Sequence, residues 1–168
     1  PETVRALPFE DNVPLFLVEM TGKGEAICPR GTLRRVVDRA ADMGFAVSAA
    51  VEFEFFMFNE TPETIRAKNY NDLTPITPGN FGYSVMRSSV HSEFYLSLMN
   101  MCRDMRMPLE ALHTETGPGV LEAALLYDDA LESADRAALI KTFTKFLAQR
   151  RGRMSTFVAK WSNKVPGQ

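Results

Sequence analysis

The most constraining feature of this sequence is a pair of glutamates inside an apolar run, Val51–Phe58. The run is rich in aromatic residues, as β-strands are, and alternate side chains of a strand share one face. Glu52 and Glu54 therefore point the same way, with roughly 6.5–7 Å between their Cα atoms. Phe56 and Phe58 continue that face, where burying unpaired carboxylates is costly. A divalent cation opposite the pair would remove this cost; the alternative is a solvent-exposed face that carries two large apolar residues.

The length and composition are those of an ordinary globular domain, with 168 residues, 45% hydrophobic and 24% charged. The net charge of −2 gives no basic signal for nucleic acid. No apolar run approaches the roughly 20 residues that cross a bilayer, and no secretory signal segment is recognisable. Two cysteines, Cys28 and Cys102, are too few for a disulfide framework or a zinc motif. The sequence therefore predicts a cytoplasmic protein without a nucleic-acid or membrane partner.

The hydrophobic periodicity predicts an α+β fold, because helices and strands mix without a strict βα repeat. Helices are expected over Thr32–Gly44, over the methionine-rich stretch 90–105, and over Asp128–Arg151. Strands are expected at Leu15–Val18, within Phe45–Phe58, on both sides of a break within Leu109–Leu126, and at Thr156–Trp161. The methionine-rich stretch is interpreted as core packing rather than as a cofactor motif. Between these elements, Asn59–Asn80 is polar and contains three prolines, which predicts a long loop without regular structure.

Two further glutamates flank the break, which is Gly117-Pro118-Gly119. Since the chain can turn there and return, Glu115 and Glu122 are able to lie near each other. With Glu52 and Glu54 they make four acidic groups, and oxygen-rich sites suit hard cations such as Mg²⁺ or Mn²⁺. Such a site commonly handles phosphates. The alternative is that Glu115 and Glu122 are ordinary loop carboxylates.

Four segments resemble successive signature blocks of the glutamine synthetase superfamily, in matching order and spacing. They are Glu52–Phe56, Gly82-Tyr83, His113–Glu122, and Phe157–Trp161 leading to Pro166–Gln168. Val120 and Trp161 depart from common glutamine synthetases, which have glutamine and proline there. The sequence thereby resembles a divergent branch that contains lengsin-like proteins and γ-glutamylamide synthetases.

The resemblance implies a catalytic domain of antiparallel sheet with packed helices, preceded by the end of a β-grasp domain. Residues 1–28 are expected to end the β-grasp domain, and residues 29–168 to form the N-terminal part of the catalytic domain. The chain would then be a fragment, inactive by itself. Its parent would assemble into rings with active sites between subunits.

The resemblance also implies an enzyme that uses ATP to phosphorylate the γ-carboxylate of glutamate and lets ammonia or a small amine displace the phosphate. Glu54, Glu115 and Glu122 would ligate the Mg²⁺ or Mn²⁺ ion that positions glutamate. Glu52 would ligate the ion that bridges the ATP phosphates. Such ions neutralise charge on the transferring phosphoryl group.

The same resemblance implies roles for three further positions. Tyr83 would line the ammonium pocket beside Glu115, whose carboxylate would attract ammonium and take up its proton. Glu110 and His113 would face the nucleotide; otherwise they are a surface glutamate and a structural histidine. Two other interpretations stay open, namely a non-catalytic, lengsin-like assembly protein and an independent metal-binding module.

Overall fold

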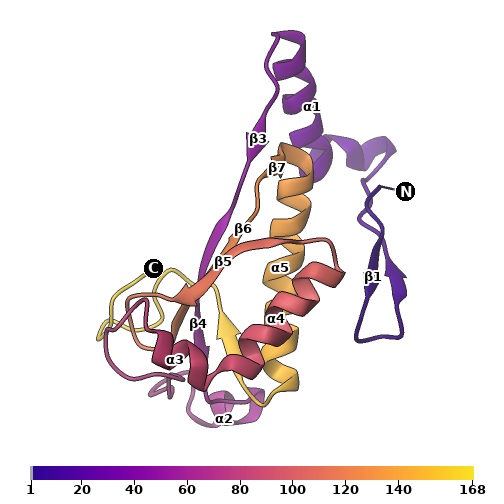
Figure 1. Cartoon of the computed structure of the whole chain (residues 1–168). Coiled ribbons are helices and arrows are strands. Elements are labelled where there is room, and N and C mark those ends of the chain that lie inside the picture. The colour runs from indigo at the N-terminus through magenta and orange to yellow at the C-terminus, as the bar shows by residue number, and fades with distance from the viewer. Residues whose placement is uncertain (1) are drawn as a thin grey trace.

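The computed structural model describes residues 2–168, and its mixture of helices and antiparallel strands confirms the expected α+β class (Figure 1). In chain order the elements are β1 (Arg5–Leu7), β2 (Val13–Leu15), the 3₁₀ helix η1 (Gly22–Ile27), α1 (Pro29–Asp42), β3 (Ser48–Ala49), β4 (Glu52–Phe58), α2 (Pro62–Ala67), α3 (Val85–Val90), α4 (Ser92–Asp104), β5 (Leu109–Thr114), β6 (Val120–Leu125), β7 (Asp128–Asp129), α5 (Ala130–Arg150) and β8 (Met154–Thr156). No helix of residues 2–168 is long and apolar enough to cross a membrane.

The central sheet has four antiparallel strands in the order β5-β6-β4-β8. The glutamate-bearing run is β4, which lies inside the sheet between β6 and β8. Strands β3 and β7 pair beyond the N-terminal end of β4, and β1 and β2 form a separate hairpin. In Figure 1 that hairpin lies on the far side of α5 from the sheet. The predicted strand pair around the Gly-Pro-Gly break is confirmed as β5 and β6.

One face of the sheet packs against α4 and α5 and forms the main core (Figure 1). Phe55, Met57 and Leu121 come from the sheet, and each is at most 1% exposed. From the helices, Leu98 and Ile140 close this core. Four of the predicted core positions of the methionine-rich stretch do pack here, namely Phe94, Leu98, Met101 and Met105, whereas Val90 does not.

The opposite face of the sheet carries the glutamates and a second, smaller apolar cluster. Phe56 and Phe58 are 0% and 1% exposed, and Val120 joins them. Trp161 covers both phenylalanines, with ring centroids 6.4 and 5.0 Å away. The alternative of a fully solvated strand face is therefore wrong for this half of β4.

Two helix predictions need correction. The helix expected over 90–105 is divided near His91 into α3 and α4, and Val90 ends α3 with 73% of its surface exposed. The segment 59–80 contains the short helix α2, although its prolines suggested none. Pro62 is at the start of α2, where a missing N–H costs nothing, and Thr61 forms a reciprocal cap with Thr64.

Two predicted strands also lie at other residues than expected. The strand expected at Thr156–Trp161 is β8, Met154–Thr156, because the chain then leaves the sheet and carries Trp161 over Phe58. The strand expected at Leu15–Val18 is β2, Val13–Leu15, and its partner β1 was not expected at all. Strands of three residues are too short to show a period in the sequence.

Candidate metal and active site

The register of the central sheet places three chemically active side chains in one row. Glu54 of β4 is directly opposite Glu122 of β6, and Glu122 is directly opposite His113 of β5. Directly opposed residues of antiparallel strands share a face, which here is the face that α4 and α5 do not cover. Residues far apart in the sequence are thus brought together by strand pairing alone.

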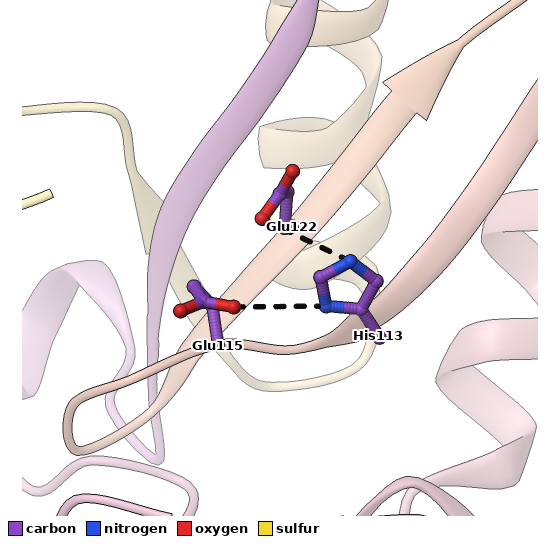
Figure 2. A group of neighbouring side chains, drawn as sticks. All are labelled: His113, Glu115 and Glu122. Atoms are coloured by element: carbon purple, nitrogen blue, oxygen red, sulfur yellow. Dashed lines mark ion pairs between the residues drawn. The ribbon is translucent and has the colours of Figure 1, made fainter. Parts of the chain in front are cut away.

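His113, Glu115 and Glu122 form a compact cluster, and Figure 2 shows that each ring nitrogen of His113 faces one of the two carboxylates. Nδ1 of His113 lies 3.9 Å from Oε2 of Glu115, and Nε2 lies 3.8 Å from Oε2 of Glu122. These distances are too long for hydrogen bonds. One potential ligand atom from each side chain lies within 4.8 Å of the other two. The three side chains therefore lie close together without forming hydrogen bonds to one another.

Glu115 shows this lack of partners most clearly. Its Oε2 atom is buried and has no hydrogen-bond partner among the described residues. Buried polar atoms of folded proteins are rarely left without a partner, so such an atom needs a reason. A cation within the cluster would supply the missing interaction, and carboxylate oxygens are the ligands that Mg²⁺ and Mn²⁺ prefer.

The turn between β5 and β6 holds Glu115 and returns the chain to Glu122. The N–H of Glu115 donates to the carbonyl of Val120 at 3.0 Å. Gly119 has φ +71°, and a Cβ there would lie 2.5 Å from the carbonyl oxygen of Met57. Only glycine combines this conformation with so close a backbone approach. The Gly-Pro-Gly break therefore packs directly on β4.

Tyr83 is attached to the free edge of β5 beside the cluster. Its backbone N–H donates to the carbonyl of Thr114 at 2.7 Å, and its ring stacks on His113 with centroids 4.8 Å apart. A Cβ on Gly82 would lie 3.1 Å from the backbone of Glu115 and Thr116. The Gly-Tyr pair is thus held against the chain that carries the cluster.

Burial, hydrogen bonds and neighbouring charges shift three pKa values in the site. Burial raises the pKa of Glu54, and the negative charges of Glu122 and Glu115 raise it further. The Thr116 N–H lowers the pKa of Glu115, an effect that burial opposes and the Tyr83 hydroxyl reinforces. The Glu115 carboxylate in turn raises the pKa of Tyr83. The face is therefore an anionic environment that favours a cation.

Of the expected site residues outside the three-residue cluster, Glu54 and Tyr83 adjoin it, whereas Glu52 and Glu110 are exposed. Glu52 is exposed at the start of β4, opposite Ala124 and one strand repeat away from Glu54. Glu110 is exposed where the pairing of β5 with β6 shifts register, between Leu109 and Ala111. Their expected contacts with nucleotide phosphates and nucleotide stay predictions.

His113 is the cluster member whose place the sequence reasoning missed. It was expected to face a nucleotide, and the structure puts one of its ring nitrogens near each of two expected metal ligands. A signal was available, because His113 and Glu115 are two residues apart and a strand repeats every two residues. The nucleotide role expected for His113 stays a prediction.

Comparisons with known proteins place this geometry in context. The family model described as "Glutamine synthetase, catalytic domain" matches residues 26–168. Type-1 glutamine synthetase 2 of Dictyostelium discoideum is 45% identical over 98% of this chain and 32% of its own length. Glutamate–isopropylamine ligase of Pseudomonas sp is 31% identical over 98% of this chain and 37% of its own length.

A solved structure shares the fold over nearly the whole chain. The complex of GmaS with ADP superposes with a TM-score of 0.84 at 24% identity, over 99% of this chain and 38% of that one. These matches confirm the fold expected for the catalytic domain. The chain spans about a third of the length of the curated relatives it matches.

Proposed function

Because the chain belongs to the glutamine synthetase family, we propose that the full-length protein is a ligase that joins ammonia or a primary amine to the γ-carboxylate of glutamate at the expense of ATP. The relatives named above are a glutamine synthetase and a glutamate–isopropylamine ligase, which supports this class of reaction. The observation that carries the proposal is the convergence of His113, Glu115 and Glu122 beside Glu54 on one sheet face.

The residues of this face fit a divalent cation. Glu115 has a buried, unpartnered carboxylate oxygen, and Glu54 and Glu122 face each other across two strands. Three carboxylates and an imidazole form a donor set suited to Mg²⁺ or Mn²⁺. Such an ion, when bound, screens the charges of glutamate and of the phosphoryl group. Glu54, Glu115 and Glu122 would hold it, with His113 adjoining.

The proposed reaction has two steps that these residues would serve. The γ-phosphoryl group of ATP passes to the γ-carboxylate of glutamate, giving ADP and an acyl phosphate. The amine nitrogen then attacks the acyl carbon, so that a C–N bond forms, the C–O bond to phosphate breaks, and inorganic phosphate leaves. Glu115 beside Tyr83 would attract the ammonium form and accept the proton that the nitrogen loses.

The remaining expected roles belong to the same proposal. Glu52 would help to hold a second ion that screens the charge of the ATP phosphates, and Glu110 would face the nucleotide with His113. Residues 1–28 would end a β-grasp domain and residues 29–168 would begin the catalytic domain. The start of the family match at residue 26 and the separate β1–β2 hairpin support that boundary. We further propose self-association into rings.

The main alternative is a lengsin-like assembly protein that has the fold without turnover. The unpartnered oxygen of Glu115 favours the ligase, because a scaffold gains nothing from carboxylates that repel one another on one face.

The test measures glutamate- and amine-dependent formation of ADP by the full-length protein, together with Mn²⁺ binding by calorimetry. Glu122→Gln keeps the size of the side chain and removes its charge, so we expect it to lower activity at least about 100-fold, in line with losses at metal and transition-state ligands. Saturable Mn²⁺ binding should weaken in the same variant.

Glu25→Gln is the matched control, because Glu25 is exposed in η1 away from the sheet. It should leave both measurements unchanged. A folded full-length protein that forms no ADP with glutamate and any amine would rule out the ligase and favour the assembly protein.

A further inference from the structure

The backbone of Tyr83 has a conformation that tyrosine rarely adopts. Its φ is +55°, in the left-handed region, where the Cβ of an L-residue crowds the following carbonyl. Tyr70 and Arg106 also have positive φ, but they lie just after α2 and α4, where a left-handed residue commonly ends a helix. Tyr83 instead precedes α3, so no helix end explains its conformation. Contacts from another part of the fold must therefore hold it.

Thr114 of β5 supplies two such contacts. Its carbonyl accepts from the Tyr83 N–H at 2.7 Å, and its side-chain Oγ1 accepts from the Ser84 N–H at 3.0 Å. These two amides lie directly before and after the Cα of Tyr83, so the two hydrogen bonds together fix both peptide planes that flank this residue. Thr114 is only 3% exposed, which leaves little access for water to replace its hydroxyl as the acceptor.

The backbone of Tyr83 determines where its ring lies. The ring stacks on His113 with centroids 4.8 Å apart, and the Glu115 carboxylate is close enough to raise the pKa of the phenol. The side chain of Tyr83 is nevertheless 70% exposed, so packing alone holds it weakly. A return of the backbone to negative φ would redirect the Cα–Cβ bond and carry the ring away from both neighbours.

The side chain of Thr114 lies on the other face of the sheet from the metal cluster. Side chains alternate along a strand, so those of His113 and Glu115 share the cluster face and that of Thr114 does not. Thr114 is directly opposite Leu121, which belongs to the main core under the helices. The hydroxyl of Thr114 therefore cannot touch a reacting atom, and any effect it has on the reaction passes through the segment that it binds.

We propose that Thr114 is a positioning residue: its hydroxyl helps to hold Tyr83 in the left-handed conformation and so keeps the tyrosine ring where the amine nitrogen binds. The inference rests on the proposed ligase function. Loss of the hydroxyl releases one of the two fixed peptide planes and lets the ring leave the amine site. Glutamate and ATP contact other groups of the site, so their binding does not depend on this hydrogen bond.

The test measures kcat and the KM of each substrate for the full-length protein, with ammonia and isopropylamine as acceptors. Thr114→Val keeps the shape of the side chain and removes the hydroxyl. We expect the KM for the accepted amine to rise about 10-fold, as for the loss of one hydrogen bond, while the KM for glutamate and for ATP changes less than about 3-fold. Thr114→Ser restores the hydroxyl and should return the amine KM to within about 3-fold of the wild type.

Hydrogen exchange, read by mass spectrometry, gives a measurement that does not depend on turnover. In Thr114→Val the amides of Tyr83 and Ser84 should exchange at least about 10-fold faster than in the wild type, because their local opening costs one hydrogen bond less. Thr144→Val is the matched control: Thr144 is 0% exposed on α5, and its hydroxyl has no partner among residues 2–168. It should change neither the amine KM nor the exchange of these two amides.

Thr114→Ala removes the same hydroxyl and provides the comparison if Thr114→Val does not fold. An unchanged amine KM in a folded variant without the hydroxyl would overturn the inference and leave the ligase intact. Equal increases in the KM for the amine and for glutamate would do the same, since they indicate general damage to the site. Absence of glutamate-dependent turnover by the wild type with any amine would overturn the proposed function, and hydrogen exchange would still decide whether Thr114 holds Tyr83.

Discussion

At the scale of single residues, Glu54 illustrates a conflict between binding and stability. It faces Glu122 directly across β4 and β6, and its pKa is raised by burial and then by the neighbouring charges. A carboxyl whose pKa is higher in the folded chain stabilises the fold below its ordinary value of 4.5 and loses that contribution as the pH rises through the folded value. Repulsion between the carboxylates of the metal-free site therefore destabilises the fold most at neutral pH.

We predict that Glu54→Gln stabilises the metal-free chain at pH 7 by about 0.2–1 kcal/mol, the usual range for like charges directly opposed on a sheet. The difference should disappear by pH 4, where Glu54 is largely protonated. Urea unfolding at both pH values measures it. In saturating Mn²⁺ the wild type should be more stable than Glu54→Gln, because only the wild type gains binding free energy.

Glu25→Gln provides the comparison, since removing this exposed charge should leave the free energy of unfolding unchanged at both pH values. A Glu54→Gln chain less stable than wild type at pH 7 without metal would contradict the idea that the carboxylates repel one another.

At the scale of elements, the segment between β4 and α3 is organised by a buried carboxylate that the sequence did not single out. Glu60 is 3% exposed, pairs with Lys68, and accepts from Thr64 Oγ1 at 2.7 Å and from the Thr74 N–H at 2.8 Å. Lys68, followed by Thr64, lowers the pKa of Glu60 to about 2. Periodicity has no way to reveal such a contact, because it joins the start of the segment to residues up to 14 positions later.

Glu60→Gln should lower the free energy of unfolding by about 1–3 kcal/mol, the cost of leaving buried partners unsatisfied. The wild type should lose the same contribution in acid: it is complete above pH 4.5 and disappears as the pH falls toward 2. Hydrogen exchange at the Thr74 amide reports the local opening.

Glu63→Gln is the matched substitution on α2, where the side chain is exposed, and it should cost less. If the two variants have equal stability, Glu60 does not hold the segment together.

At the scale of the whole molecule, ion pairs join the N-terminal segments to α5. Arg5, only 2% exposed, donates to Glu132 at 2.7 Å. Arg30 at the start of α1 forms a bidentate ion pair with Asp135, donating from Nε to Oδ1 at 2.9 Å and from Nη2 to Oδ2 at 3.0 Å. Asp135 is 5% exposed, so this two-point contact is largely shielded from solvent.

Asp135→Asn should lower the free energy of unfolding by about 1–3 kcal/mol, because it removes the buried counter-charge of Arg30 and leaves only the more exposed Glu19. Unfolding in urea, without guanidinium salts that would screen the ion pair, measures this change in the free energy of unfolding. Asp104→Asn breaks a pair whose members are 71% and 42% exposed, and it should cost less than about 1 kcal/mol. Similar losses in both variants would show that the link to α5 contributes no more than a surface pair.

Much of the fold followed from local patterns. Asp129 caps α5 close to the predicted start of that helix, and the Gly-Pro-Gly break separates β5 from β6 as expected. Some predictions failed where a distant contact decides the outcome, although α2 was missed despite its local cap. Trp161 leaves the sheet to cover Phe58, and the chain between α3 and α4 turns at His91 although the apolar period continues.

The sequence by itself determined the family of this chain and the groups available to its site: carboxylates on alternate strand positions, a glycine-rich break that returns the chain, and blocks in the order found in one family. Those features depend on residue type and spacing, which the sequence states directly. Only the tertiary structure decided that His113 joins the cluster, that Glu52 and Glu110 lie outside it, and that the Thr114 carbonyl accepts from Tyr83. The physical reason is strand register and helix packing, which pair residues by their positions in space rather than by their distance along the chain.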